Sequence, residues 1–563
     1  MEKRLFIAVL LSIALLFAWG ALLPKFFPEL AKQKEAAQKA SSTATQAPAS
    51  GSAAPPSATA PPPGTTAPVT ASSASSPAPV SATPQEAIQA AGPREATVKK
   101  PAYEARFSNR GGQLTTFLLH RYRDEEGDEV NLVKARAADR SDFPFAIITP
   151  DETLNRLVNG SLYQMSEEDS GGKHVITFQY AQPGVVKVTK KFTFGTAYPF
   201  DFSIRVEGIS QPYRIVLGPG MRKLGQNEIE NRFMASGNGV VQREDGSLKV
   251  VGREKAEAFQ LFSGQPQFVG IEDNYFLAVF IPTKSGDAVF RAIDVPAPLE
   301  KSKKRRELYA GLNAVNGTVE GKAFFGPKEV ELLQQYGLEK TLQFGIFGVI
   351  ARVLLIALKW IYTFTGNYGW AIIFLTVVIK LLLYPLQHKS IVSMKKMQRI
   401  QPKVNALRDK FRKAKTDPQQ KQRLNAEMMK LYSQEGINPM SGCFPMLLQL
   451  PILWAFYSLL SHAIAVRGEP FIFWIKDLSA KDPYYITPIL MMVTMFVQQW
   501  MTPTTADPTQ RRMFLFMPLI FGWIFKEFPS GLVLYWLVQN ILTIAQQGIM
   551  NYYWKEHPES LPG

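Results

Sequence analysis

The feature that most constrains this chain is a series of apolar runs in its C-terminal third. Five of them occupy residues 368–386, 442–462, 485–501, 513–528 and 531–550. As helices, segments of this length cover most or all of a hydrocarbon core of ~30 Å. The whole-chain composition, 46% hydrophobic and 20% charged, therefore averages a membrane part with other parts and argues against a single soluble globular enzyme.

The N-terminus has a further apolar run. Lys3 and Arg4 precede an apolar stretch at residues 5–23. This stretch is longer than the hydrophobic region of a usual secretory signal, and no clean Ala-x-Ala cleavage site follows it. We therefore expect residues 1–23 to be an uncleaved transmembrane anchor rather than a signal peptide, with Lys3 and Arg4 in the cytoplasm.

Residues 24–95 are predicted to be a disordered tether. Of the 45 residues from 40 to 84, 40 are Ala, Pro, Ser or Thr, and none is charged. Such a segment lacks the large apolar side chains whose burial offsets the entropy of ordering. Its proline content keeps it extended and gives reach to whatever follows.

Residues 96–340 are predicted to form an all-β domain. Apolar and polar residues alternate along residues 186–194 and again along 200–206, and further strand-like runs are separated by Gly, Pro and Asp-rich turns. This period of two is typical of an antiparallel sandwich. His120 and His174 leave open a sugar-processing enzyme, although two isolated histidines are more often surface or satisfied core residues.

Few residues are available for metal or covalent chemistry. The single cysteine, Cys443, excludes an intramolecular disulfide and a Cys-rich zinc site. Its apolar neighbours favour a structural role over a nucleophilic one. We expect no catalytic residue, no metal and no cofactor.

Residues 341–365 are predicted to form an amphipathic helix that lies along the headgroups. Arg352 and Lys359 are seven residues apart and so share one helical face, while apolar residues occupy the remainder. A helix packed in a soluble core is the alternative.

The charges of the connecting segments orient the spans. Residues 387–436 contain 13 Lys or Arg and 4 Asp or Glu, whereas residues 464–483 contain 3 of each kind. The positive-inside rule places the first segment in the cytoplasm and the second outside. With the anchor, this gives six spans, both termini and the tail 551–563 in the cytoplasm, and the β domain outside.

The basic segment 387–436 is itself predicted to be a helical hairpin. Apolar residues recur at spacings of three and four, with a break around Asp417 and Pro418. Its charge could contact ribosomal RNA, anionic lipid or nascent chains, or it could only reflect the positive-inside rule.

The polar residues within the spans gather toward the cytoplasmic side. They are Thr376, Lys380, Gln449, Gln498, Gln499, Gln539, Asn540, Thr543, Gln546 and Gln547. The outer halves are largely apolar, with Tyr535 and Trp536 suited to a boundary between wet and apolar surroundings. Because polar groups in lipid usually face a bundle interior or water, we expect a hydrophilic cavity that opens to the cytoplasm and the inner leaflet. For Lys380, snorkelling to the interface is the alternative.

Several of these residues lie in runs that resemble the YidC-type membrane protein insertases. The runs are GNYGW at 366–370, NPMSGCFPMLLQLP at 438–451, DPYY at 482–485 and FPSGLVLYW at 528–536. The resemblance covers roughly residues 324–550 in order. The anchor and large exported domain resemble the Gram-negative form, whose periplasmic domain is a β-supersandwich similar to sugar-binding mutarotase-like domains.

The resemblance implies a polytopic α-helical protein with six transmembrane helices, five of them (366–550) forming the core, plus an all-β periplasmic supersandwich. It also implies insertion of nascent membrane proteins, alone or with the Sec translocon, through an inner-leaflet groove with one basic residue. Lys380 matches that residue, where well-known members have Arg. Thr376, Gln449, Tyr535 and Trp536 match the groove or its wall. Ribosomes and anionic lipids are further candidate partners, and DNA is not.

Two other functions remain open on the residues alone. A transporter would need polar residues along a whole pathway, whereas the outer halves here are apolar. An exported sugar-modifying enzyme would need converging carboxylates or histidines in residues 96–340.

Overall fold

The computed structural model describes residues 86–134, 143–225, 228–229, 237–256, 259–296, 304–411, 417–436, 444–502 and 508–556. The predicted anchor at residues 1–23, most of the predicted tether, Cys443 and the end of the predicted tail lie outside these ranges.

The described residues of the β domain form three sheets, and all of their strand pairs are antiparallel. The first has the order β1 (Glu95–Lys99), β2 (Tyr103–Ser108), β3 (Gln113–Arg123), β4 (Glu129–Asn131). The second has the order β13 (Gln260–Phe262), β16 (Ala288–Pro296), β17 (Lys304–Asn313), β10 (Arg214–Leu217), β5 (Ala146–Ile148). The third has the order β12 (Leu248–Val251), β11 (Asn238–Gln242), β14 (Phe268–Glu272), β15 (Phe276–Lys284), β18 (Thr318–Pro327), β9 (Phe200–Glu207), β8 (Val186–Phe194), β7 (Lys173–Gln182), β6 (Gln164–Ser170).

The alternation in the sequence sets which side chains face the core. In β8, Val186, Val188, Phe192 and Phe194 are fully buried, and Phe192 pairs with Phe202 of β9. The strands predicted along residues 186–194 and 200–206 are therefore confirmed. Lys190 occupies an inward position of the same alternation and is fully buried.

Aromatic rings fill the space between the sheets. Phe145, next to β5, lies 4.9 Å from Phe192 and 5.2 Å from Phe280 between ring centroids. Phe107 of β2 lies 4.6 Å from Phe192. Side chains from all three sheets thus share one core, and a short helix α3 (Glu152–Gly160) closes part of its edge.

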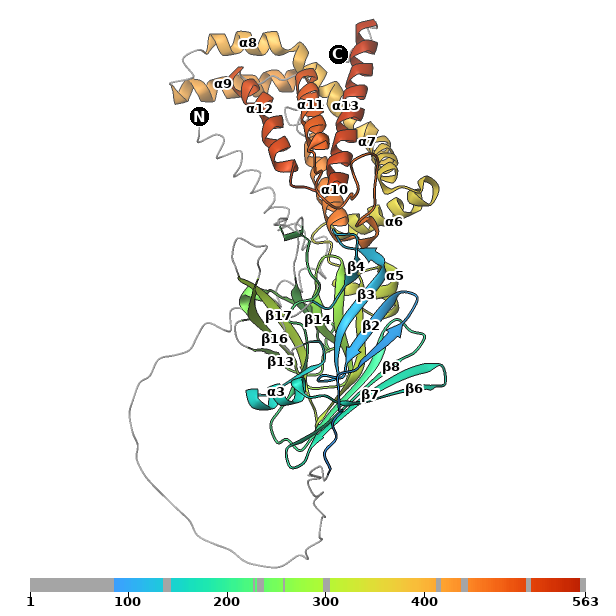
Figure 1. The fold of residues 1–563 in the computed structure, drawn as a ribbon. Helices are drawn as coiled ribbons and strands as arrows, with labels where there is room; N and C mark the ends of the chain where they lie inside the picture. The colour runs from blue at the N-terminus through green and yellow to red at the C-terminus, as the bar shows by residue number, and fades with distance from the viewer. Residues whose placement is uncertain are drawn as a thin grey trace, which may run out of the picture. The chain divides into compact units, whose positions relative to one another are not determined.

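The helical part follows the β domain. Its elements are α5 (Val330–Gln335), η2 (Glu339–Thr341), α6 (Gly348–Thr365), α7 (Tyr368–Arg399), α8 (Gln401–Lys410), α9 (Pro418–Gln434), α10 (Phe444–His462), η5 (Ile464–Val466), α11 (Ile486–Met501), α12 (Pro508–Phe525) and α13 (Ser530–Glu556). The helices α7, α10 and α11 each contact α13 (Figure 1). Each of the five predicted spans coincides with most of one helix: α7, α10, α11, α12 or α13.

The dipeptide Gly366-Asn367 separates α6 from α7. Gly366 has φ +61°, which glycine adopts without a Cβ clash, and its N–H caps α6 through the carbonyl of Tyr362. The Asn367 side chain accepts the N–H groups of Gly369 and Trp370 and so caps the start of α7. The chain therefore ends one helix and begins the next within two residues.

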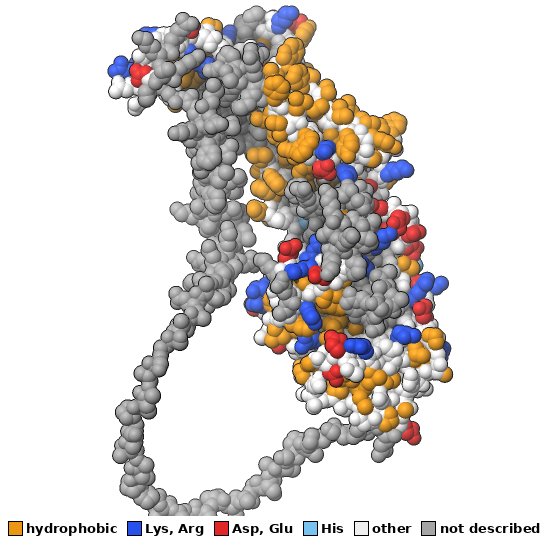
Figure 2. Space-filling model, turned by 60° about the vertical axis from the view of Figure 1, so that its left-hand side comes forward, with side chains coloured by type: hydrophobic (Ala, Val, Ile, Leu, Met, Phe, Trp, Pro, Cys, Tyr) orange, Lys and Arg blue, Asp and Glu red, His pale blue; other side chains and the backbone are white. Residues whose placement is uncertain are grey.

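Large apolar side chains are exposed along the helices. On α6 they are Val349, Ile350, Val353, Ile356, Trp360 and Phe364, and α7, α10, α11, α12 and α13 add others. Figure 2 shows hydrophobic side chains gathered over the helical part, while charged side chains are interspersed over the β domain. Such a surface fits lipid rather than water.

Three described helices are long and apolar enough to cross a membrane, judged by length and composition: α6, α7 and α13. The apolar stretches Ile486–Met501 and Leu515–Phe525 are shorter. The helix α6 meets this criterion although the sequence predicts that it lies along the headgroups; its orientation stays a prediction. One of its two cations, Lys359, pairs with Glu331 of α5 at 2.7 Å.

The basic segment 387–436 contains the end of α7 together with α8 and α9. A small cluster of Met397, Ile400, Val404 and Tyr432 holds these helices together. Asp417 caps α9, and Pro418 stands at its first position, where a missing N–H costs nothing. Most of the basic side chains that the structure describes in this segment are exposed.

Candidate functional site

A set of polar side chains lies between α7, α10 and α13, within otherwise apolar helices. We call it the polar seam and define it as Lys380, Gln449, Tyr535, Gln539 and Thr543. Three helices contribute to it, and hydrogen bonds connect them. The sequence predicted every one of these residues as part of a site.

Lys380 joins α7 to α13. Its ammonium group donates to the Thr543 hydroxyl over 2.8 Å, and the Thr543 hydroxyl in turn donates to the backbone carbonyl of Gln539, one turn earlier in α13, over 2.7 Å. Only 7% of Lys380 is exposed. The side chain therefore contacts the neighbouring helix instead of reaching away along its own helix to open surroundings.

Gln449 joins α10 to α13. Its amide donates to the Tyr535 hydroxyl, and its carbonyl accepts from the Gln539 amide at 3.5 Å, a marginal distance. The Tyr535 ring is fully buried and stacks on Phe456 at 4.2 Å. Tyr535 thus has an apolar body packed against α10 and a polar tip in the seam, as expected of this side chain.

A second polar face of α13 points toward α11. Asn540 donates to Thr494 over 3.3 Å, and Gln547 donates to Thr502 over 3.3 Å. Asn540 therefore lies in a helix–helix contact beside the seam and not within it. Gln498 of α11 is half-buried, and no hydrogen bond among the described residues joins its side chain to the seam.

The two remaining predicted residues flank the seam. Thr376 lies one turn before Lys380, is fully buried, and donates back to the Ile372 carbonyl over 2.6 Å. Trp536 faces α12, where its ring lies 5.1 Å from Phe525 and 6.1 Å from Phe521. Trp536 is separated from the seam because neighbouring residues on a helix point in different directions.

Two polar residues that the sequence did not predict as part of the site continue the same face of α7. Gln387 and Ser390 are 7% and 4% exposed, at helical spacing from Lys380. On α13, Gln546 is also buried, and neither of its amide atoms has a hydrogen-bond partner among the described residues. The periodicity from Lys380 through Gln387 could have indicated the α7 residues, but they were assigned to the cytoplasmic hairpin.

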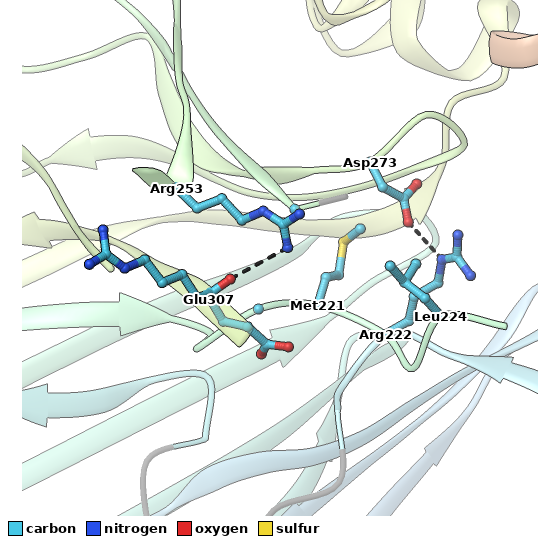
Figure 3. A pocket seen from close by; sticks show the side chains of 9 residues that line it. Met221, Arg222, Leu224, Arg253, Asp273 and Glu307 are labelled. Carbon is cyan, nitrogen blue, oxygen red and sulfur yellow. Dashed lines mark hydrogen bonds and ion pairs between the residues drawn. The ribbon is translucent and has the colours of Figure 1, made fainter. Parts of the chain in front are cut away.

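The β domain does not bring its histidines together. His120 contacts Glu129 at 3.0 Å, and His174 contacts Asp169 at 2.8 Å, each on its own hairpin. The pocket in Figure 3, lined by residues such as Met221, holds about 20 Å³. That is room for about one water molecule and too little for a sugar.

One group of carboxylates could hold a metal ion. Asp124, Glu126 and Asp128 lie close together in an exposed turn. Asp124 already accepts the N–H groups of Glu126 and Asp128, and Glu126 pairs with Lys223. These contacts explain the closeness of the three carboxylates by the structure of the turn itself.

Comparison with known protein families divides the chain in two. Residues 95–357 match the family described as YidC periplasmic domain, and residues 360–557 match the family described as 60Kd inner membrane protein. The boundary between the matches falls within α6.

Whole-length relatives carry one common name. The chain is 34% identical over 570 residues to a membrane protein insertase YidC of Geotalea daltonii, covering 98% of this chain and 99% of the relative. It is 37% identical over 577 residues to the membrane protein insertase YidC of Citrifermentans bemidjiense, with the same coverage. A crystal structure titled as an active YidC insertase aligns at 20% identity and a TM-score of 0.36, covering 82% of this chain and 94% of that one. The chain thus belongs to the YidC family of inner-membrane protein insertases, with a periplasmic β domain, and its function is membrane protein insertion rather than enzymatic catalysis.

Proposed function

We propose that the polar seam is the inner-leaflet groove through which this insertase moves nascent transmembrane segments out of the cytoplasm. The observation that supports the proposal most is the pair of hydrogen bonds that join α13 to its neighbours, from Lys380 of α7 to Thr543 and from Gln449 of α10 to Tyr535, with the Gln539 amide 3.5 Å from Gln449 between them. Five interacting polar groups within otherwise apolar helices are costly in lipid, so they mark a functional site.

The seam would act by replacement of hydrogen bonds. The polar flank of a client would exchange its water for contacts with Lys380, Thr543 and the two amides, and the seam would give up its internal hydrogen bonds in return. Because the number of hydrogen bonds changes little, the barrier to moving polar groups past the inner leaflet falls. Burial of the client's own apolar helix in lipid then supplies the driving force.

A lysine in this position supplies a positive charge but lacks the planar guanidinium group of an arginine. The Lys380 ammonium is a point charge on a flexible stem, so it attracts acidic or carbonyl groups of a client without imposing bidentate geometry. We therefore infer that the charge and the wet surroundings matter here, and that a fixed pairing geometry does not.

The orientation in the membrane follows from the loop charges. We propose six spans with both termini in the cytoplasm, because the basic hairpin at 387–436 carries a net charge of +9, from 13 Lys or Arg and 4 Asp or Glu. The same charge suits transient contact with ribosomes or anionic headgroups. Insertion would proceed either alone or beside the Sec translocon.

Cysteine labelling tests the groove and the orientation together. In a Cys443→Ser background, Thr543→Cys and the matched control Ile541→Cys are treated with a membrane-impermeant maleimide. Ile541 is half-exposed on the opposite face of α13. We expect Thr543→Cys to label in inverted inner-membrane vesicles and not in right-side-out ones, while Ile541→Cys labels in neither. Labelling of Thr543→Cys from the periplasmic side, or from no side, would contradict the proposal.

A further inference from the structure

The turn between β14 and β15 contacts the C-terminal end of α10. The Asn274 amide donates to the Ser461 carbonyl over 2.9 Å, and both residues are buried. Carbonyls in the last turn of a helix have no partner within the helix. A side chain of the periplasmic domain therefore caps a helix of the insertase core.

A buried group of four charges lies beside this turn. Arg222 donates to Asp273 over 2.7 Å and to both oxygens of Glu228 over 2.7 and 2.8 Å (Figure 3 shows the first of these). Arg467, in the loop that follows α10, pairs with Glu228 at 3.6 Å. The four side chains are between 4% and 11% exposed, and their two positive and two negative charges balance.

Two charges of this group, Asp273 and Arg467, also contact neighbouring segments of the chain. Asp273 accepts the N–H groups of Tyr275 and Phe276, each at 2.8 Å, which holds the shape of the turn. Arg467 lies over the rings of the same two residues and donates to the Arg123 carbonyl over 2.9 Å. Arg467, a residue of the insertase core, thus contacts two separate hairpins of the periplasmic domain.

The surrounding charges favour the ionised form of the Glu228 carboxylate. Burial alone would raise the pKa of Glu228, but the attraction of Arg222 and Arg467 outweighs burial and lowers this pKa. Removing one partner from such a buried set leaves a charge without compensation, which is strongly destabilising.

Apolar burial reinforces the contact. Ile464, which follows α10, is 4% exposed and belongs to the hydrophobic cluster of the β domain. On another face of the domain, Phe268 and Leu277 belong to a cluster that also contains Leu459 of α10. Charged, polar and apolar contacts therefore join the periplasmic domain to the C-terminal end of α10 and to the loop that follows it.

We propose that the periplasmic domain docks rigidly on the insertase core through Arg467 and thereby holds the C-terminal end of α10 in place. We call this docked contact the clamp. Gln449 of the polar seam is on α10, so the clamp would keep one wall of the seam in position. The docking claim itself does not depend on the groove mechanism, since the contacts stand whether or not clients pass through the seam.

Hydrogen exchange in the full-length protein in lipid nanodiscs tests the clamp. The variants are Arg467→Ala and the matched control Lys476→Ala, an exposed residue of the same loop. In the unmodified protein, peptides covering residues 268–277 and 459–467 should both be protected. Arg467→Ala should speed exchange in both peptides by roughly tenfold, and Lys476→Ala should leave both unchanged. Peptides from β7 and β8 serve as a check that the sandwich remains folded.

The outcomes separate clearly. Rapid exchange of residues 268–277 in the unmodified protein would overturn the clamp, and so would an Arg467→Ala effect confined to its own loop. If Arg467→Ala does not fold, Asn274→Ala replaces it. This change removes the cap and leaves the four charges in place, and it should speed exchange at residues 459–462 while β7 and β8 remain protected. An unchanged exchange rate at 459–462 in that variant would also overturn the proposal.

Discussion

We expect the stability of the periplasmic domain to depend on pH through the buried Lys190. Its ammonium group is fully buried and donates to the carbonyls of Gly111 over 2.6 Å and Phe145 over 2.8 Å. Among the described residues no carboxylate pairs with it. Burial lowers the pKa of Lys190 from 10.5 to about 7.

The sign and size of the effect follow from linkage. Between pH 7 and 10.5 the unfolded chain binds a proton that the folded domain does not, so stability rises with pH in this window. Burying Lys190 costs about 5 kcal/mol of folding free energy below pH 7 and about 2 kcal/mol at pH 9. This cost disappears above pH 10.5.

Chemical unfolding of Lys190→Met and the matched control Lys191→Met measures this effect. Lys191 is the next residue of β8 and is exposed. The Lys190→Met variant loses two hydrogen bonds at every pH but also loses the titration. Relative to the unmodified protein, the free energy of unfolding of Lys190→Met should therefore fall by about 3 kcal/mol between pH 6 and pH 9. A pH-independent difference, or the same dependence in Lys191→Met, would refute the reasoning.

Two further predictions concern the helical core. Lys380→Met removes the charge and the hydrogen bond to Thr543, which is worth about 1.5–3 kcal/mol. Insertion of a client with an acidic flank into proteoliposomes should therefore slow about tenfold in this variant, whereas Lys380→Arg should retain most of the rate. An unchanged rate in the Met variant would show that the charge is dispensable. A Cβ on Gly369 would lie 2.0 Å from the Phe471 ring, whereas one on Gly548 would meet nothing within 4 Å. Thermal unfolding in detergent should therefore show Gly369→Ala destabilised by about 1–3 kcal/mol and Gly548→Ala neutral or slightly stabilised; equal stability of the two variants would contradict the close packing at Phe471.

The sequence predicted the strands well because alternation of apolar and polar residues is a local signal. Residues 186–194 and 200–206 show this, with Phe192 and Phe202 as cross-strand partners. Lys190 was not predicted to be buried, because only the folded chain brings the carbonyls of Gly111 and Phe145 to an inward-facing lysine.

The site could be predicted as a set of residues but not as a set of contacts. Polar side chains in apolar runs identify candidates, and Lys380 and Gln449 were found in this way. Which candidates meet depends on helix rotation: Gln539 and Thr543 face α7 and α10, whereas Asn540 and Gln547 face α11. The cap of α10 by Asn274 could not be predicted from the sequence, since it joins residues 187 positions apart.

The central claim is that clients pass along the polar seam, and photo-crosslinking to a ribosome-stalled client tests it most directly. A photoreactive amino acid is placed at Gln449 or Gln539, each with a control on the same helix that is half-exposed on another face, Trp454 or Ile541. We expect Gln449 and Gln539 to capture the stalled transmembrane segment and its polar flank, and the two controls to capture mainly lipid. Capture only at Trp454 and Ile541 would show that clients enter along the lipid-facing surface and would contradict the groove.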